Sequence, residues 1–112
     1  VDDLSTGRRE NLDGLEGRIA VHEGSILDPA LLAGACTGAD CVIHQAALAS
    51  VVGSVRDPVA TNAVNVDGTL NVLVAARDAG LPVLLENDVD VLKWFKPAKG
   101  DFQIHFSRPA ED

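Results

Sequence analysis

Apolar residues recur with a helical period in one long segment, residues 57–80. Asp57 followed by Pro58 is typical of an N-cap and a first helical residue, and Gly80 is a typical helix end. Between them, apolar side chains are spaced alternately by four and three positions, which predicts one stripe along a long helix. The predicted stripe consists of Val59, Ala63, Val66, Leu70, Leu73 and Ala76.

A second, shorter helix is predicted within residues 25–38. Asp28 is a suitable N-cap, Pro29 takes the first helical position, and Gly38 closes the pattern.

Short apolar segments beside these helices have the pattern of strands. We interpret Asp2 as the end of one strand, and residues 18–24 alternate as a second. Residues 40–47 form a continuous apolar run, typical of a strand buried on both faces, and residues 81–86 begin a further strand. Strands that alternate with helices predict an α/β fold with an open, doubly wound parallel sheet.

The composition changes sharply toward the C-terminus. Residues 1–92 contain five Arg and no Lys, whereas residues 93–112 contain three Lys, one Arg and all the Trp and Phe residues. We therefore expect two segments of different origin. These are a folded segment over residues 1–83 and an unrelated tail over residues 84–112, with one short helix and one strand.

Charge and cysteine spacing narrow the classes of function. The net charge of −8 argues against nucleic-acid binding, and no apolar run is long enough to cross a membrane. Cys36 and Cys41 match no metal or redox spacing, so we expect two core residues of a cytoplasmic protein. His22, His44 and His105 share no ligand spacing, and no metal site is expected. Because the chain contains no Met, we expect a piece of something longer.

Candidate chemistry lies where the predicted parallel strands end, because ligands collect beyond the carboxyl ends of such strands. Asp2 and Asp3 offer carboxylates that suit the hydroxyls of a ribose, while a carboxylate would repel a 2′-phosphate. The small residues Ala46 and Ala47 would let the backbone approach a flat or phosphorylated ligand. The alternative interpretations are a solvated loop for the aspartates and a local hydrogen-bonding or exposed position for the polar Asn65.

Four segments in order resemble one enzyme family: VDDLSTGRRENL, VHEGSILDPALL, DCVIHQAALASV and DPVATNAVNVDGTLNVLVAARDAG. The chain is similar over residues 1–83 to the NAD-dependent nucleotide-sugar epimerases and dehydratases. These are extended short-chain dehydrogenases/reductases of the UDP-glucose 4-epimerase type. The resemblance implies a partial Rossmann-like, NAD-binding domain, a nucleotide-sugar substrate in the parent enzyme, and a homodimer as a possible assembly of that parent.

The resemblance also implies which residues contact NAD. Asp2 falls on the acidic position that holds the adenosine ribose, and Ser25 stands where the family usually has an Asp near the adenine. Asn65 matches a buried helix residue that neighbours the cofactor site. The full candidate set is Asp2, Asp3, Ser5, Thr6, Gly7, Ser25, Ile26, Gln45, Ala46, Ala47 and Asn65.

Several parts of the family pattern are missing from this sequence. The first strand and the Gly-rich loop that would precede Val1 are absent, and no Tyr occurs anywhere, so the family's Tyr-x-x-x-Lys acid/base pair is absent. Family members are isomerases or lyases, and we expect this chain to be inactive alone. In the doubly wound order the missing strand lies between the strands ending at Asp2 and His44. We expect those two strands to close up, or the chain to be only marginally stable.

The tail, residues 84–108, has a fainter resemblance to the large subunit of type III restriction enzymes. Two alternatives to an epimerase fragment therefore stay open. One is a non-functional chimeric or truncated gene product, and the other is a tail-derived piece of a restriction endonuclease subunit.

Overall fold

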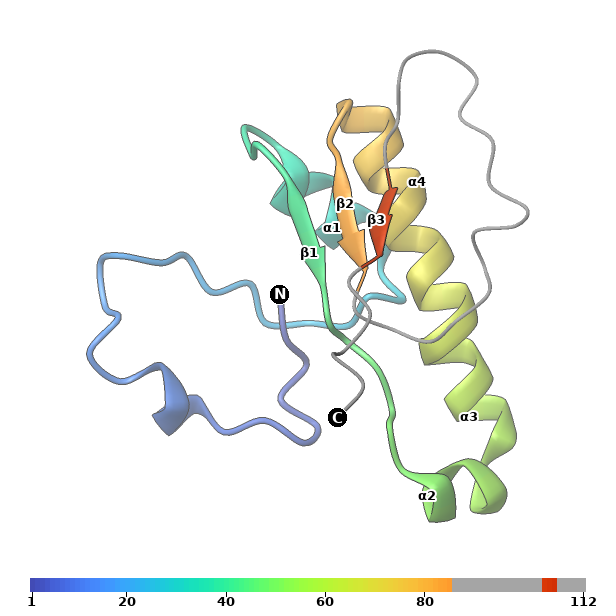
Figure 1. Ribbon diagram of the computed structural model, residues 1–112. Coiled ribbons are helices and arrows are strands. Elements are labelled where there is room, and N and C mark those ends of the chain that lie inside the picture. Colours follow the sequence, from blue (N-terminus) through green and yellow to red (C-terminus); the bar gives the residue numbers. More distant parts are fainter. Residues whose placement is uncertain (86–103, 107–112) are drawn as a thin grey trace.

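The computed structural model describes residues 1–85 and 104–106, and its centre is a small parallel sheet (Figure 1). Three strands are hydrogen-bonded in the order β1 (Val42–His44), β2 (Val83–Leu85) and β3 (Ile104–Phe106). Val42 aligns with Val83, and Val83 aligns with Ile104. The expected α/β class with a parallel, partial Rossmann-like sheet is confirmed.

The described helices lie before β1 and between β1 and β2. They are η1 (Arg9–Leu12, a 3₁₀ turn), α1 (Pro29–Cys36), α2 (Val51–Arg56), α3 (Pro58–Asn62), η2 (Ala63–Gly68, a π-helical segment) and α4 (Thr69–Ala79). In the view of Figure 1, α1 and α4 lie behind the sheet. Val42 and His44 face these helices, and Ile43 faces the other way with 61% of its surface exposed.

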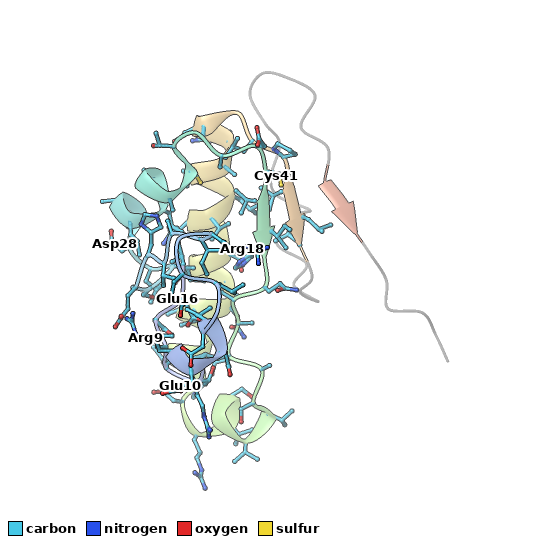
Figure 2. All side chains as sticks on the ribbon, turned by 90° about the vertical axis from the view of Figure 1, so that its left-hand side faces the viewer. Arg9, Glu10, Glu16, Arg18, Asp28 and Cys41 are labelled. Carbon is cyan, nitrogen blue, oxygen red and sulfur yellow. The ribbon has the colours of Figure 1, made fainter. Side chains whose placement is uncertain are left out.

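The predicted helix starts are confirmed by their capping contacts. The Oδ1 atom of Asp28 accepts hydrogen bonds from the backbone N–H groups of Ala30 and Leu31, at 2.9 and 3.2 Å. Asp28 lies at the start of α1 in Figure 2. Asp57 accepts from the N–H of Ala60 at 2.9 Å, so both Asp-Pro pairs begin helices as expected.

The long helix over residues 57–80 forms as α3, η2 and α4, but its predicted stripe is wrong at Val59, Val66 and Leu70. Val59 is 77% exposed and Leu70 42%, whereas Leu73 and Ala76 are fully buried. The π-helical segment takes more residues per turn than an α-helix, so a stripe counted in steps of four and three loses its phase there. Moreover, α3 extends past the end of the sheet, where it has no sheet to pack against (Figure 1).

The strand expected over residues 18–24 does not form. The segment makes one isolated parallel bridge, between Asp2 and Glu23, and Ile19 and Val21 are exposed. The expected direct pairing of the strands ending at Asp2 and His44 is also absent, because β1 pairs with β2 alone among the described strands. Closing-up of the sheet is therefore a wrong prediction.

Among the residues that the structure describes, two contiguous apolar clusters pack the helices against the sheet. The larger consists of Cys36, Leu73, Ala76, Leu81, Val83 and Leu85, and the smaller of Ile26, Leu32 and Val72. Cys36 is thus a core residue as expected, and burial raises the pKa of its thiol. The expectation for Cys41 is wrong, since this residue is exposed next to β1 (Figure 2).

The predicted boundary between the folded segment and the tail, after residue 83, falls inside β2, because this strand continues to Leu85. The short helix expected in the tail lies outside the described residues, whereas the expected tail strand is present as β3. Within residues 1–85 and 104–106, no helix is both long and apolar enough to span a membrane.

Candidate functional site

One cavity of about 1080 Å³ lies between the N-terminal segment and β1. Its lining runs along β1 and includes parts of α1 and of the segment before β1. Three further parts of the lining follow predicted strand ends, so one end of the cavity lies at the edge where ligands collect in parallel sheets. Ten of the eleven candidate residues line it: Asp2, Asp3, Ser5, Thr6, Gly7, Ser25, Ile26, Gln45, Ala46 and Ala47. The remaining candidate, Asn65, is outside this lining.

The loop after Asp2 is folded around two carboxylates. Oδ1 of Asp2 accepts the N–H of Leu4 at 2.8 Å, and Oδ1 of Asp3 accepts the N–H of Ser5 at 3.0 Å. Hydrogen bonds from the side chain and backbone of Ser5 lower the pKa of Asp3, so this carboxyl stays ionised at neutral pH. Leu4 takes a positive φ of 54°, a conformation that an ordinary side chain adopts only under strain.

The loop turns back at Gly7, where its backbone lies close to the Asp2 carboxylate. A Cβ atom at Gly7 would lie 3.2 Å from Oδ2 of Asp2, closer than side chains normally approach. No described residue donates a hydrogen bond to this Oδ2 atom, which therefore remains an exposed acceptor on the cavity wall. This arrangement suits a neutral ligand group with two hydroxyls.

Ser25 and Ile26 form a second part of the wall. Oγ of Ser25 accepts the N–H of Leu27 at 3.1 Å, which fixes the turn before α1. Ile26 is buried in the smaller cluster, where its side chain fills the space left by Gly68. The Ile26 carbonyl accepts a hydrogen bond from Nδ2 of Asn71 at 3.2 Å, so α4 holds this wall segment in place.

Asn65 holds the loop that follows β1, and this loop lines the cavity. Its Oδ1 accepts the N–H of Leu48 at 2.7 Å, and its Nδ2 donates to the Leu48 carbonyl at 3.1 Å. The side chain thus pairs with Leu48 as a neighbouring strand would, and Leu48 lines the cavity just after Gln45–Ala47. The π-helical segment that contains Asn65 is a type of irregularity found often at functional sites.

Sequence reasoning missed a buried pair at the end of β1. Nε2 of His44 lies 2.9 Å from Oγ1 of Thr69, and both residues are buried. Oγ1 of Thr69 donates its only proton to the Asn65 carbonyl at 2.7 Å, so it must accept a proton from Nε2 of His44. Burial lowers the pKa of His44 because it disfavours the charged ring. The partners are 25 residues apart, and no local pattern links them.

Comparison with known proteins decides the family. A family model described as the 3-beta hydroxysteroid dehydrogenase/isomerase family, one of the extended short-chain dehydrogenases/reductases, matches residues 3–89. The chain belongs to this family. The sequence resemblance to the extended short-chain dehydrogenases/reductases is thereby confirmed.

Solved structures of UDP-glucose 4-epimerases from the extended short-chain dehydrogenases/reductases share the fold of this chain. The enzyme of Thermus thermophilus, in complex with NAD, is 36% identical with a TM-score of 0.66, and the match covers 74% of this chain and 27% of that one. The Brucella ovis enzyme with NAD is 35% identical, with a TM-score of 0.68 and coverages of 77% and 26%. The Thermotoga maritima enzyme with UDP-glucose is 32% identical, with a TM-score of 0.68 and coverages of 77% and 28%.

This family member therefore spans about a quarter of the length of these epimerases. The matched enzymes bind NAD or UDP-glucose in their structures. Among the residues described for this chain, no three His, Cys, Asp or Glu side chains are grouped to hold a metal ion.

Proposed function

We propose that this chain forms the adenosine-ribose side of an NAD site in a nucleotide-sugar epimerase or dehydratase. The observation that carries the proposal is one cavity lined by ten candidate residues from three separate segments of the chain. Two epimerases that share more than a third of their aligned residues with this chain hold NAD in their structures. The donor set of the cavity fits the ribose half of such a dinucleotide.

Each part of the cavity wall has a chemical task in this proposal. Oδ2 of Asp2 accepts hydrogen bonds from the ribose hydroxyls, and its charge disfavours the 2′-phosphate of NADP. Ser25 offers a hydroxyl on the adenine side, and Gln45–Ala47 lie along the remaining half of the cofactor. Bound NAD would supply a hydride acceptor. Asn65 is a positioning residue, since it holds the Gln45–Ala47 loop through Leu48.

We propose in addition that the chain is inactive alone. It contains no Tyr, and the family's acid/base step needs a Tyr whose pKa is lowered by a nearby Lys and the nicotinamide charge. The parent enzyme would act on a nucleotide sugar, as UDP-glucose in the Thermotoga maritima structure suggests. Assembly of that parent as a homodimer and a cytoplasmic location, consistent with the free thiols of Cys36 and Cys41, belong to the same proposal.

Calorimetric titration with NAD and with NADP tests the proposed site. We expect NAD to bind more tightly than NADP, and Asp2→Asn to weaken NAD binding by about tenfold, because a hydrogen bond to a charged group contributes about 1.5–3 kcal/mol. The Asn side chain keeps the Oδ1 acceptor for Leu4, so the turn is preserved. Asp13→Asn changes the same charge outside the cavity and should leave NAD affinity unchanged. Absence of heat at millimolar NAD would contradict cofactor binding by this chain.

A further inference from the structure

We propose that the Asp13–Gly14 bond is a site of spontaneous covalent modification, at which the aspartate closes onto the nitrogen of Gly14 and reopens as isoaspartate. Three observations carry the proposal: the exposure of the loop after η1, the backbone conformation at Gly14, and a carboxylate beside the Gly14 N–H group. The proposed NAD site plays no part in this chemistry.

Two Asp-Gly pairs occur in the sequence, and the structure places them in opposite surroundings. A glycine after an aspartate favours ring closure, because it has no side chain to hinder its nitrogen and its backbone rotates freely. Asp13 and Gly14 follow η1, and both are exposed. Asp67 and Gly68 lie in η2, where Gly68 is buried against Ile26. The second pair is therefore a control for the first within the same chain.

The loop around Gly14 is free to adopt the cyclic geometry. Ring closure needs rotation about the Cα–C bond of Asp13, which brings the Gly14 nitrogen to the side-chain carboxyl group. Gly14 takes a φ of 82°, and a Cβ atom on it would meet nothing within 4 Å. No backbone carbonyl of the described residues accepts its N–H. Residues 9–18 contribute to neither apolar cluster and lie away from the sheet in Figure 1, so the rotation does not disturb the core.

The second Asp-Gly pair is held in a helical conformation. Gly68 has φ −61° and ψ −44°, and Asp67 precedes it inside the same π-helical segment. Rotation at Asp67 would disrupt the turn that contains Asn65, whose side chain holds Leu48. This pair can therefore react only when η2 opens locally.

Glu16 supplies a proton acceptor beside the reacting nitrogen. Its carboxylate accepts the backbone N–H groups of Glu16 itself and of Gly14, and these contacts lower the pKa of Glu16. The carboxylate is thus ionised at neutral pH. It can take up the proton that the Gly14 nitrogen loses during the attack.

The reaction needs only water besides the chain. The Gly14 nitrogen forms a bond to Cγ of Asp13, while its proton, taken up by Glu16, and a hydroxyl group of the Asp13 carboxyl leave as water. A five-membered succinimide ring results. Addition of water at Cγ restores aspartate, whereas addition at the main-chain carbonyl leaves the backbone linked through Cγ and frees the α-carboxylate. This product, isoaspartate, has the mass of aspartate and one more methylene group in the backbone.

Prolonged incubation of the folded chain at neutral pH and body temperature tests the proposal. Cleavage after arginine then separates the two pairs into peptides 10–18 and 57–77. Isoaspartate is quantified in each peptide by methylation with an isoaspartyl methyltransferase and S-adenosylmethionine, and it is located by fragmentation mass spectrometry. We expect it to accumulate at least about tenfold faster in peptide 10–18, because η2 must open before Asp67 reacts. Equal rates in the folded chain, or no isoaspartate in peptide 10–18, would overturn the proposal.

Unfolding and a conservative variant complete the test of the site. In guanidinium chloride the two pairs should react at similar rates, and a difference that persists there would show that the fold is not what protects Asp67. Asp13→Glu keeps the charge but would have to close a larger ring, so its peptide 10–18 should stay free of isoaspartate. Isoaspartate in that peptide of Asp13→Glu would place the reaction at Asn11 and overturn the assignment.

Two further variants test the proton acceptor. Glu16→Gln should slow the reaction at Asp13 by severalfold, less than the factor of about one hundred that a base in a closed site contributes, because solvent competes in this exposed loop. Glu10→Gln removes a neighbouring exposed carboxylate and should keep the wild-type rate. An unchanged rate in Glu16→Gln would overturn the role assigned to Glu16.

Discussion

His44 shows how a single buried residue links the sheet to the helix beneath the candidate site. The ring donates to Thr69, and Thr69 donates to the Asn65 carbonyl, so the tautomer of His44 is determined by its partner. A proton added to this buried ring would place a charge in the core. Asn65 in turn holds Leu48, and the chain of contacts therefore extends from β1 to the loop after it.

This contact predicts a pH dependence of stability. The pKa of folded His44 lies below its ordinary value of 6.5, so the unfolded chain binds more protons as the pH falls through that value. The contribution of neutral His44 to the free energy of unfolding is complete above about pH 6.5 and decreases below it, by at most about 1.4 kcal/mol per pH unit.

Urea midpoints at about pH 7.5 and pH 5.5, on either side of the ordinary histidine pKa, measure this effect. The wild-type chain should lose more stability over this interval than His44→Gln, in which the side chain does not titrate. His22→Gln removes an exposed histidine and should retain the wild-type dependence. Identical slopes for wild type and His44→Gln would show that His44 is not the responsible group.

At the scale of elements, the ends of the helices could be predicted from the sequence, whereas the face that each helix buries could not. Asp28, Pro29 and Gly80 act within a few residues of themselves, so the start of α1 and the end of α4 could be read from the sequence. The π-helical segment contacts Leu48 and Ile26, which lie far away in the sequence, so its irregular turn has no local sequence signal. For that reason a stripe counted with a regular helical period wrongly includes the exposed Val59.

Two helix glycines should respond oppositely to alanine. A Cβ atom at Gly68 would lie 2.5 Å from Cδ1 of the buried Ile26, so Gly68→Ala should destabilise the chain by about 1–2 kcal/mol despite its better helix propensity. Gly34 in α1 has open space around it, and Gly34→Ala should stabilise by about 0.5–1 kcal/mol. Thermal melting of both variants checks the signs, and stabilisation in both would show that Ile26 can move aside.

At the scale of the whole molecule, long-range pairing accounts for the two wrong strand predictions. Residues 18–24 have the alternation of a strand, but alternation forms a strand only where a partner edge continues alongside, and here Asp2 offers a single bridge. The candidate site was predictable as a set because parallel strands end at one edge. Whether the segments that carry these residues pair directly or leave a cavity between them depends on long-range strand pairing. No local sequence pattern encodes that pairing.

The position of β2 predicts how the chain can be shortened. Ending the chain at residue 83 removes Leu85, which is 4% exposed and belongs to the larger cluster, whereas ending it at residue 89 keeps β2 complete. Both shortened chains lack β3, so they form a matched pair. We expect cooperative thermal unfolding, followed by circular dichroism, for the longer chain and its loss for the shorter one, because burial of one Leu contributes about 1.5–3 kcal/mol. Equal melting curves would instead support a boundary at residue 83.

The place of β1 in the sheet has a consequence for the behaviour of concentrated solutions. Among the described strands β1 is hydrogen-bonded only to β2, and a strand edge of this kind beside the exposed Ile43 favours stacking of folded chains into aggregates. Mutual repulsion between acidic copies opposes this stacking. This protection weakens with added salt, since the Debye length shrinks from about 30 Å at 0.01 M to about 3 Å at 1 M. We therefore expect the net negative charge of this chain to limit aggregation through the β1 edge at low ionic strength. Salt at about 1 M should remove that protection.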